Sequence, residues 1–317
     1  MGRFKRSVYL GALGLAISAG GLTGCDGEGS PPAGGYPAKG EIHYPGSSWQ
    51  TAGAETVGLS KSGLDDAIRG MNSGSDCVAV VKDGYMVASE GSRTRTHNPW
   101  SVGKSVLSAI IGIMYTNGTI DSLDDPGAGR GNSIRENLEQ TINGSWSYSP
   151  TGGQSRAADI VADYSGTSVG RAASRYLFDP LGMTRSDMAS SGFMNTTCED
   201  LARVGLLLAS GGEWDGKKLI SDEYMEEAVK PVRGNSAYGF LFWLNHRGNW
   251  SSTTGMSGRN SKPIPGAPDD LIVMKGLGGQ IVLVMPSSNI VVVRLGTSIG
   301  DTMGVARDIY NDLALAF

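Results

Sequence analysis

The sequence predicts an α+β fold in which strands from both ends of the chain form one antiparallel sheet beside a helical region. Two observations predict it. Short apolar runs bounded by turn residues occur near the start, within residues 77–89, and again near the end, within residues 271–295. The stretch between them carries the helical patterns, so the sheet is expected to form from segments far apart in the sequence, with helices beside it.

The domain is expected to begin with a short amphipathic helix over Leu59–Met71. Two strands follow, at Cys77–Val81 and Tyr85–Ser89. The segment Lys82-Asp83-Gly84 joins them, and an Asp-Gly turn between two apolar runs is a strong hairpin signal. These two strands supply the N-terminal part of the sheet.

The next helix is predicted over Ser101–Tyr115. It follows Asn98-Pro99 and ends near Gly118, so a capping residue, an early proline and a terminal glycine stand in the order typical of a helix. Apolar residues cover most of its circumference, which predicts a buried helix. Gly118–Asn143 is polar and glycine-rich, and only a helix around Ile134–Gln140 is expected there.

The C-terminal part combines helices, an aromatic segment and strands. We expect helices over Ala157–Leu177 and Cys198–Leu208, an aromatic strand or turn over Tyr238–Trp243, strands over Leu271–Met274, Gln280–Met285 and Ile290–Leu295, and a closing helix over Thr302–Ala316. Pro286–Asn289, between the last two strands, is a second hairpin signal.

The first residues have the pattern of a secretory signal peptide. Gly2–Ser7 is basic, and Val8–Gly21 is apolar but too short to span a membrane. Leu22–Cys25 then resembles the lipobox of bacterial lipoproteins, in which the cysteine is lipidated and becomes the first mature residue. The alternative is an ordinary signal cleaved nearby, with Cys25 incidental. The lipobox predicts an exported protein with a lipid anchor, and Asp26 resembles an inner-membrane retention signal of Gram-negative bacteria, which would place it on the periplasmic face.

These patterns divide the 317 residues into three parts. Residues 1–24 are the expected signal peptide. Residues 25–52 are rich in Gly, Pro and Ser and are expected to form a flexible tether. Residues 53–317 are expected to form one domain, since a chain of that length can bury a single core. The net charge of −4 gives no electrostatic attraction to nucleic acid or to anionic lipid.

Two cysteines remain once Cys25 is assigned to lipid. In an oxidising compartment, Cys77 and Cys198 could form a disulfide, and the alternative is two separate buried thiols. Spacing alone does not decide between them, because it does not show that the two residues are close.

The motif that carries chemistry is Ser101-Val102-Gly103-Lys104. Residues three apart on a helix share a face, so the Lys104 amine can lie beside the Ser101 hydroxyl. A serine hydroxyl becomes a good nucleophile when a neighbour takes its proton, and a lysine can do so if burial lowers its pKa. A Ser-x-x-Lys spacing is common by chance. The preceding proline and the buried helix therefore carry the interpretation, since a lysine on an inward face is costly unless it is used.

Several segments together resemble the family of class C β-lactamases, penicillin-binding proteins and related esterases and aminohexanoate-oligomer hydrolases. In family order they are Pro99–Ala109, Tyr148-Ser149-Pro150, Asp179–Met183, Asn195–Gly205, Gly276–Gln280 and Val291–Gly296. The Ser-x-x-Lys motif is also that of the class A relatives of this group. The resemblance covers about residues 75–317 and implies a β-lactamase/transpeptidase-like fold with a trimmed helical region.

The resemblance also implies roles for site residues. Ser101 would be the nucleophile, with Lys104 and Tyr148 moving protons. The backbone N–H groups of Ser101 and Gln280 would form the oxyanion hole. The implied substrate-binding residues are Leu277, Gly278, Gly279 and Trp243.

Three departures from the family pattern bear on the substrate. Pro150 replaces the amide side chain common after the tyrosine. Leu277 stands where a lysine or histidine often stands. The segment from Ser101 to Tyr148 is shorter than in the relatives.

Other kinds of site fit less well. Gly103-Lys104-Ser105 ends like a phosphate-binding loop, but Asn98 stands where that loop needs its first glycine. The histidines His43, His97 and His246 form no triad-like or metal-like group, so we assign no metal and no cofactor.

The sequence therefore predicts a serine hydrolase that acts on ester or amide bonds of small substrates through an acyl-enzyme. The first alternative is a β-lactamase or a D-Ala-D-Ala carboxypeptidase-type enzyme. The alternative of another class is a non-catalytic lipoprotein that binds in the cell envelope. No nucleic-acid partner is expected, contact with the membrane is expected through the lipid anchor alone, and the oligomeric state is left open.

Overall fold

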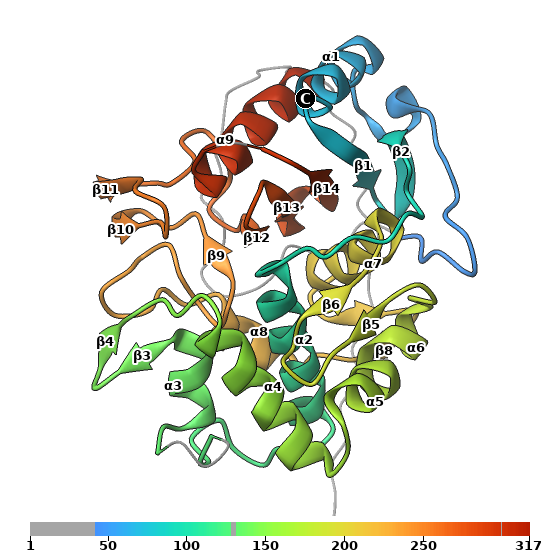
Figure 1. Cartoon of the computed structure of the whole chain (residues 1–317). Coiled ribbons are helices and arrows are strands. Elements are labelled where there is room, and N and C mark those ends of the chain that lie inside the picture. The colour runs from blue at the N-terminus through green and yellow to red at the C-terminus, as the bar shows by residue number, and fades with distance from the viewer. Residues whose placement is uncertain (1–41, 128–130, 299) are drawn as a thin grey trace, which may run out of the picture. The chain divides into compact units, whose positions relative to one another are not determined.

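A six-stranded antiparallel sheet forms the centre of the structure, a computed structural model that describes residues 42–127, 131–298 and 300–317 (Figure 1). The strand order is β2-β1-β14-β13-β12-β9. The strands are β1 (Ser75–Lys82), β2 (Tyr85–Gly91), β9 (Trp243–Leu244), β12 (Ile272–Gly276), β13 (Gln280–Met285) and β14 (Ile290–Gly296). Strand β1 pairs with β14, so the two ends of the domain meet in the middle of the sheet, as the sequence predicted.

Both faces of this sheet are buried, which explains why its central strands are almost continuously apolar. Successive side chains of a strand point to opposite faces. In β14, Val291, Val293 and Leu295 pack into the larger of two hydrophobic clusters, while Ile290 and Val292 pack into the other. The same alternation holds in β1 and β13.

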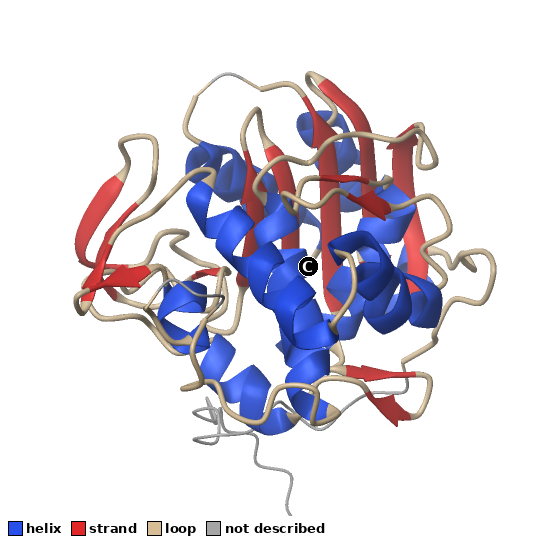
Figure 2. Cartoon of the chain, turned by 60° about the horizontal axis from the view of Figure 1, so that its bottom comes forward, coloured by secondary structure: helices blue, strands red, loops and turns tan. Residues whose placement is uncertain are grey.

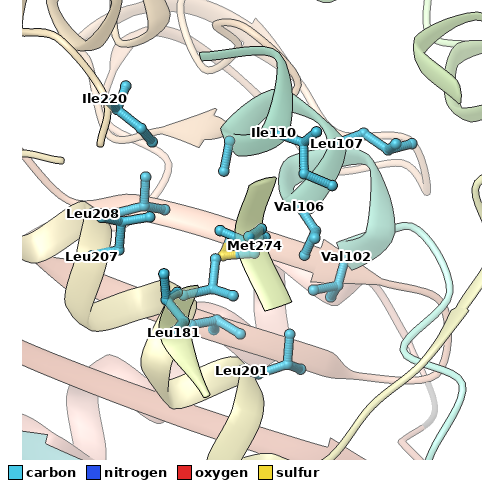
Figure 3. Close-up of a cluster of buried hydrophobic side chains, with 14 of the residues drawn as sticks. Val102, Val106, Leu107, Ile110, Leu181, Leu201, Leu207, Leu208, Ile220 and Met274 are labelled. Atoms are coloured by element: carbon cyan, nitrogen blue, oxygen red, sulfur yellow. The ribbon is translucent and has the colours of Figure 1, made fainter. Parts of the chain in front are cut away.

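Different helices cover the two faces (Figures 1 and 2). On one face lie α1 (Lys61–Met71) and α9 (Thr302–Leu313), the first and last α-helices described. On the other lie α2 (Val102–Thr116) and α7 (Cys198–Ala209). Figure 3 shows Val102, Val106, Leu107 and Ile110 of α2 in one cluster with Met274 of β12, so the predicted buried helix packs directly against the sheet.

The remaining elements lie around α2 and α7, beside α1 and α9, or at the edges of the sheet. The helices are α3 (Ile134–Glu139), α4 (Gly152–Ser165), α5 (Val169–Ala173), α6 (Asp179–Leu181), α8 (Asp222–Ala228), the π-helix η2 (Ser174–Phe178) and the 3₁₀ turns η1 (Ala54–Val57), η3 (Pro286–Ser288) and η4 (Ala314–Ala316). The two-stranded hairpins are β3 (Thr141–Ile142) with β4 (Ser145–Trp146), β5 (Asp187–Met188) with β6 (Met194–Asn195), β7 (Glu213–Trp214) with β8 (Lys217–Lys218), and β10 (Gly248–Ser251) with β11 (Ser257–Ser261).

One predicted helix, Ala157–Leu177, is wrong as a single element. The chain turns at Gly166, whose φ of 64° is left-handed, and such a residue ends a helix. Ser168 then starts a new helix by accepting a hydrogen bond from the Arg171 N–H. The helical region is therefore a set of short helices.

Residues 42–52, which the sequence assigns to the tether, pack on the domain. The indole of Trp49 is 8% exposed, donates a hydrogen bond to the Glu199 carbonyl at 3.2 Å and lies against the Arg203 guanidinium. Thr51 forms a bridge with Met86 of β2. A buried tryptophan with its N–H satisfied anchors a segment that composition alone marks as flexible. The rest of the expected tether, and Cys25, lie outside the described residues.

A disulfide joins Cys77 of β1 to Cys198 at the start of α7, with the Cα atoms 6.6 Å apart. It ties the N-terminal hairpin to a helix 121 residues later in the chain. Of the two interpretations that the spacing allowed, the structure therefore contains the disulfide. Among the described helices, none combines the length and the apolar character needed to cross a membrane.

Candidate active site

The site is built at the first turn of α2. Ser101 stands at the N-cap of this helix, and the N–H groups of Val102, Gly103 and Lys104 close tight turns onto the carbonyls of residues 99–101. Almost every residue of α2 is buried, so the helix fixes these groups rigidly against the sheet. The positive end of the helix dipole adjoins the serine.

Ser101 and Lys104 lie side by side, as the three-residue spacing predicted. The Lys104 amine is 2.9 Å from the Ser101 hydroxyl oxygen and donates a second hydrogen bond to the Pro150 carbonyl at 2.5 Å. Lys104 is 1% exposed. Among the described residues no carboxylate pairs with it. A buried, unpaired cation is unfavourable, so this environment favours the neutral amine.

The pKa of Lys104 follows from that environment. Burial lowers it from the usual 10.5 to about 8, and the positive charge of Arg156 on α4 contributes to the lowering. A substantial fraction of the amine is therefore neutral near pH 8. A neutral amine at hydrogen-bond distance can accept the proton of the serine hydroxyl.

Tyr148 reaches the same place from the loop between β4 and α4. Its hydroxyl hydrogen-bonds with the Ser101 side chain, and the Lys104 amine lies 5.2 Å from its ring centroid. Burial raises the pKa of Tyr148. The phenol therefore stays protonated at the pH at which Lys104 is neutral, so it is suited to passing on a proton rather than acting as a charged base.

An aromatic cluster holds Tyr148 in position. Trp243 lies 5.9 Å from its ring centroid and Tyr238 lies edge-on at 6.1 Å. Trp146 contacts both Tyr148 and Trp243. Trp243, predicted to bind substrate, is only 3% exposed and stands behind Tyr148. It therefore supports the tyrosine and presents no free face to a substrate, which corrects that prediction.

The end of β12 adjoins the nucleophile through Gly276. A Cβ built on Gly276 would lie 2.1 Å from the Pro99 carbonyl oxygen and 3.2 Å from the Ser101 nitrogen. The strand can approach the helix this closely only because the residue has no side chain. This backbone contact places the end of β12, beyond its pairing with β9 at Ile272 and Val273, beside Ser101.

The structure does not support Gln280 as the second oxyanion donor. Gln280 pairs with Gly276 across the β12–β13 ladder and so lies one strand farther from Ser101. Its side-chain amide donates a hydrogen bond to the Gly296 carbonyl of β14 and accepts one from the Gly296 N–H, so the side chain is fixed inside the sheet. The family resemblance identified the correct hairpin. The three-residue turn at 277–279, however, leads the chain away from Ser101 before residue 280.

The other predicted substrate-binding residues lie in that turn. Leu277 follows Gly276 and is 61% exposed. Gly278 and Gly279 have φ angles of 77° and 81°, a conformation that favours glycine, so their role is to form the turn. Of the predicted residues, the structure thus brings together Ser101, Lys104, Tyr148 and the turn that carries Leu277.

Sequence reasoning missed three groups at the site. The Pro150 carbonyl accepts a hydrogen bond from Lys104, and Arg156 helps to lower the pKa of that lysine. Trp100, directly before the nucleophile, has a φ of 52° and is 44% exposed. A main-chain carbonyl gives no sequence signal. The position of Trp100 between Pro99 and Ser101 was visible, but its backbone conformation was not.

None of the three histidines contacts Ser101. His97 lies 3.6 Å from an Asp76 carboxylate oxygen, His43 stacks on Tyr85, and His246 is within hydrogen-bond distance of the Val229 carbonyl. Within the ranges that the structure describes, no three His, Cys, Asp or Glu side chains gather in a way that could hold a metal ion.

No family model matches this chain. No curated protein matches it in sequence either. Solved structures do match. A β-lactamase from Mycobacterium bovis is 18% identical with a TM-score of 0.62, over 80% of this chain and 97% of that one. A penicillin-binding protein homologue from Caulobacter crescentus is 13% identical with a TM-score of 0.62, over 84% and 99% of the two chains.

A third match is a candidate 6-aminohexanoate-dimer hydrolase from Bacillus anthracis. It is 17% identical with a TM-score of 0.58, over 86% of this chain and 88% of that one. At such low identities these similarities establish the fold. The part of the chain that the structure describes has the β-lactamase/transpeptidase-like fold.

Proposed function

We propose that this protein is a serine hydrolase that cleaves ester or amide bonds of small substrates through an acyl-enzyme. One observation carries the proposal: the Ser101 hydroxyl lies 2.9 Å from the amine of a buried lysine whose pKa is about 8. A nucleophile beside a base whose neutral form is well populated near pH 8 is the arrangement that acyl transfer requires.

In the acylation step the Ser101 oxygen attacks the substrate carbonyl carbon, and its proton passes to the neutral Lys104 amine. The C–O bond to serine forms, and the carbonyl oxygen takes the negative charge. When this tetrahedral intermediate collapses, the bond to the leaving group breaks. The Tyr148 hydroxyl, hydrogen-bonded to Ser101, passes the proton on to the leaving alcohol or amine.

Water completes the reaction by attacking the ester that links the acyl group to Ser101. Lys104, neutral again, accepts a proton from this water, directly or through Tyr148. When this second tetrahedral intermediate collapses, the bond between the acyl carbon and the Ser101 oxygen breaks and the acid leaves. Lys104 gives its proton to the serine oxygen, directly or through Tyr148. The same two residues therefore serve both halves of the reaction.

The negative charge on the carbonyl oxygen needs hydrogen-bond donors. We assign one to the Ser101 N–H, at the positive end of α2. We assign the second to a backbone N–H at the end of β12 beside Gly276, beyond the pairing with β9, in place of the Gln280 N–H. Gly276 is the strand residue whose backbone touches Pro99 and Ser101.

The substrate preference that we propose follows from two polar side chains that relatives have and this site lacks. Pro150 offers no side-chain amide, and its carbonyl is occupied by Lys104. Leu277 offers no cation to a substrate carboxylate. Each lost polar contact weakens binding by about 1–3 kcal/mol, and more when the partner is charged. We therefore expect activity on small activated esters, and on short linear amides, to exceed activity on penicillins and cephalosporins.

Side-by-side kinetics test this preference. We expect kcat/KM on nitrophenyl butyrate to exceed kcat/KM on a chromogenic cephalosporin, and both activities to disappear in Ser101→Ala. A higher kcat/KM on the cephalosporin would replace the proposal with the β-lactamase alternative. A lack of reaction with any acyl substrate or probe would favour the non-catalytic envelope lipoprotein.

We also propose that the protein is exported and anchored by lipid at Cys25, as the lipobox-like Leu22–Cys25 predicts. Phase partitioning in detergent tests this. The wild-type protein should enter the detergent phase, and Cys25→Ser should remain in the aqueous phase or stay uncleaved. Equal partitioning of the two proteins would rule out lipidation.

A further inference from the structure

Two of the four large hydrophobic side chains exposed in the described part of the chain adjoin the nucleophile. They are Trp100, 44% exposed, and Leu277, 61% exposed. The other two, Leu315 and Phe317, lie at the C-terminal end of the chain. Single exposed apolar residues are common on proteins, so the location beside Ser101 is the informative feature.

Trp100 is held in a conformation that tryptophan rarely adopts. Its φ of 52° is left-handed, and the Asn98 side chain accepts a hydrogen bond from its N–H at 2.8 Å. The indole meets the ring of Phe193 edge-on, with centroids 6.4 Å apart. Backbone strain of this kind persists only where the surroundings enforce it, and it is concentrated at functional sites. The hydrogen bond to Asn98 therefore holds the backbone of Trp100, and the contact with Phe193 orients its indole.

The chain segment that carries Leu277 reaches the same contact from the sheet. Gly276 packs on the Pro99 carbonyl and the Ser101 nitrogen. Leu277 is the next residue after Gly276, and Trp100 is the residue between Pro99 and Ser101. The two apolar side chains therefore come from the two chain segments that touch at this contact. We call Trp100, Phe193 and Leu277 the apolar rim.

An acyl group on Ser101 starts from the contact at which the segments of Trp100 and Leu277 meet. During the reaction it is bonded covalently to the Ser101 oxygen. Its surroundings are therefore Lys104 and Tyr148, together with the chain neighbours of Ser101 and the end of β12. The basic side chains at the site, Lys104 and Arg156, come from helices α2 and α4 instead, and Lys104 is buried.

We propose that the apolar rim selects substrates with an uncharged, linear apolar acyl chain of about four to six carbons, and that Trp100 and Leu277 are the residues that determine this specificity. The inference rests on the proposed function and adds the substrate class to it. Each methylene group that leaves water on the rim should raise kcat/KM by up to about fourfold, which corresponds to about 0.8 kcal/mol.

The test compares nitrophenyl acetate, butyrate and hexanoate with the mono-nitrophenyl ester of adipic acid. The adipate has the acyl length of hexanoate but ends in a carboxylate. We expect kcat/KM to rise at least about tenfold from acetate to hexanoate and to fall at least about tenfold from hexanoate to adipate. A faster reaction with adipate would instead indicate that Arg156 receives a carboxylate, and would overturn the inference.

Two variants assign the effect to the rim. Trp100→Asn removes the indole but keeps a residue that tolerates a positive φ, and Leu277→Ser changes an exposed side chain. Each should reduce the hexanoate-to-acetate ratio of kcat/KM at least about threefold, through hexanoate, while Ser101 still reacts with an acyl-phosphonate. Leu315→Ser is the matched control, since Leu315 is 60% exposed but lies in η4, and it should leave the ratio unchanged.

The outcomes separate this inference from the function on which it rests. A flat chain-length series in a wild-type protein that hydrolyses esters through Ser101 would overturn the apolar rim alone. An unchanged ratio in both Trp100→Asn and Leu277→Ser would do the same. If no turnover depends on Ser101, the proposed function fails, and the inference with it.

Discussion

Replacing Lys104 by methionine separates the catalytic use of this lysine from its cost to the fold. Methionine has a similar length and shape but no charge. The lysine is 1% exposed, and burial lowers its pKa from 10.5 to about 8. Because the folded protein binds this proton more weakly than the unfolded chain does, the lysine destabilises the fold wherever the unfolded chain is protonated.

The size of the effect follows from the two pKa values. At about 1.4 kcal/mol for each pH unit, the difference between 10.5 and about 8 corresponds to about 3 kcal/mol below pH 8. The methionine loses hydrogen bonds to the Ser101 hydroxyl and the Pro150 carbonyl, each worth about 1 kcal/mol. Lys104→Met should therefore be about 1 kcal/mol more stable than wild type at pH 6–7.

The sign of the difference should reverse with pH. Between pH 8 and pH 10.5 the unfolded chain still binds the proton while the folded wild-type protein has lost it. The free-energy penalty on the wild-type fold therefore decreases as the pH rises and disappears above pH 10.5. The lost hydrogen bonds then dominate, and the variant becomes the less stable protein. Thermal melts of both proteins from pH 6 to pH 10.5 should show a Tm difference of about 2–4 °C in favour of the variant at pH 6–7, shrinking and changing sign toward pH 10.5.

Activity should change in the opposite sense. Without its base, Lys104→Met should hydrolyse nitrophenyl butyrate at least about 10³-fold more slowly. Lys275→Met is the control, because Lys275 is also buried with a pKa of about 8, but its amine lies on the Trp243 ring, 3.9 Å from the centroid, and bonds to Thr302. It should keep its reaction with an acyl-phosphonate. A Lys104→Met protein that is less stable than wild type at every pH, or that keeps wild-type turnover, would refute the reasoning.

Three further predictions concern the strand contact, the pH profile and the disulfide. Gly276→Ala places a methyl group against the Pro99 carbonyl, so β12 has to move, and we expect at least about a 100-fold loss of kcat/KM. Gly216→Ala is the control, because its methyl group strains a turn with a φ of 75° but meets no neighbouring atom, and it should keep its activity. Normal turnover in Gly276→Ala would contradict the contact between β12 and Pro99. The kcat/KM of wild type should rise through pH 8 as Lys104 loses its proton, and a profile that falls over that range would exclude the neutral amine as base. Replacing Cys77 and Cys198 together by alanine should lower the free energy of unfolding by up to about 4–5 kcal/mol, since the disulfide closes a loop of 121 residues. Denaturant titration measures the difference. Equal midpoints for the wild-type protein and the double variant would show that the bridge does not form.

The parts of the site that could be predicted from the sequence depend on local geometry. A spacing of three residues on one helix brings Ser101 and Lys104 together whatever the rest of the chain does. The apolar residues around the circumference of α2 already indicated that this helix is buried. The sheet could be predicted for a similar reason, because its hairpins are set by short turn sequences and each of its central strands is apolar on both faces.

The parts that could not be predicted depend on contacts between distant segments. Whether Gly276 or Gln280 faces the serine is decided by where the turn begins, and the glycine-rich sequence fits several registers. The buried position of Trp243 behind Tyr148 results from packing across two loops. Trp49 docks beside Glu199 and Arg203, far along the chain, within a segment whose composition is typical of a tether.

The central claim is that Ser101 becomes acylated with Lys104 as its base. Mass spectrometry of the intact protein after incubation with a fluorescent acyl-phosphonate, followed by peptide mapping, measures this directly. The account predicts one adduct, on Ser101, in the wild-type protein, a much slower adduct in Lys104→Met, and none in Ser101→Ala. Labelling of Ser101→Ala at the wild-type rate, or an adduct on another residue, would contradict it.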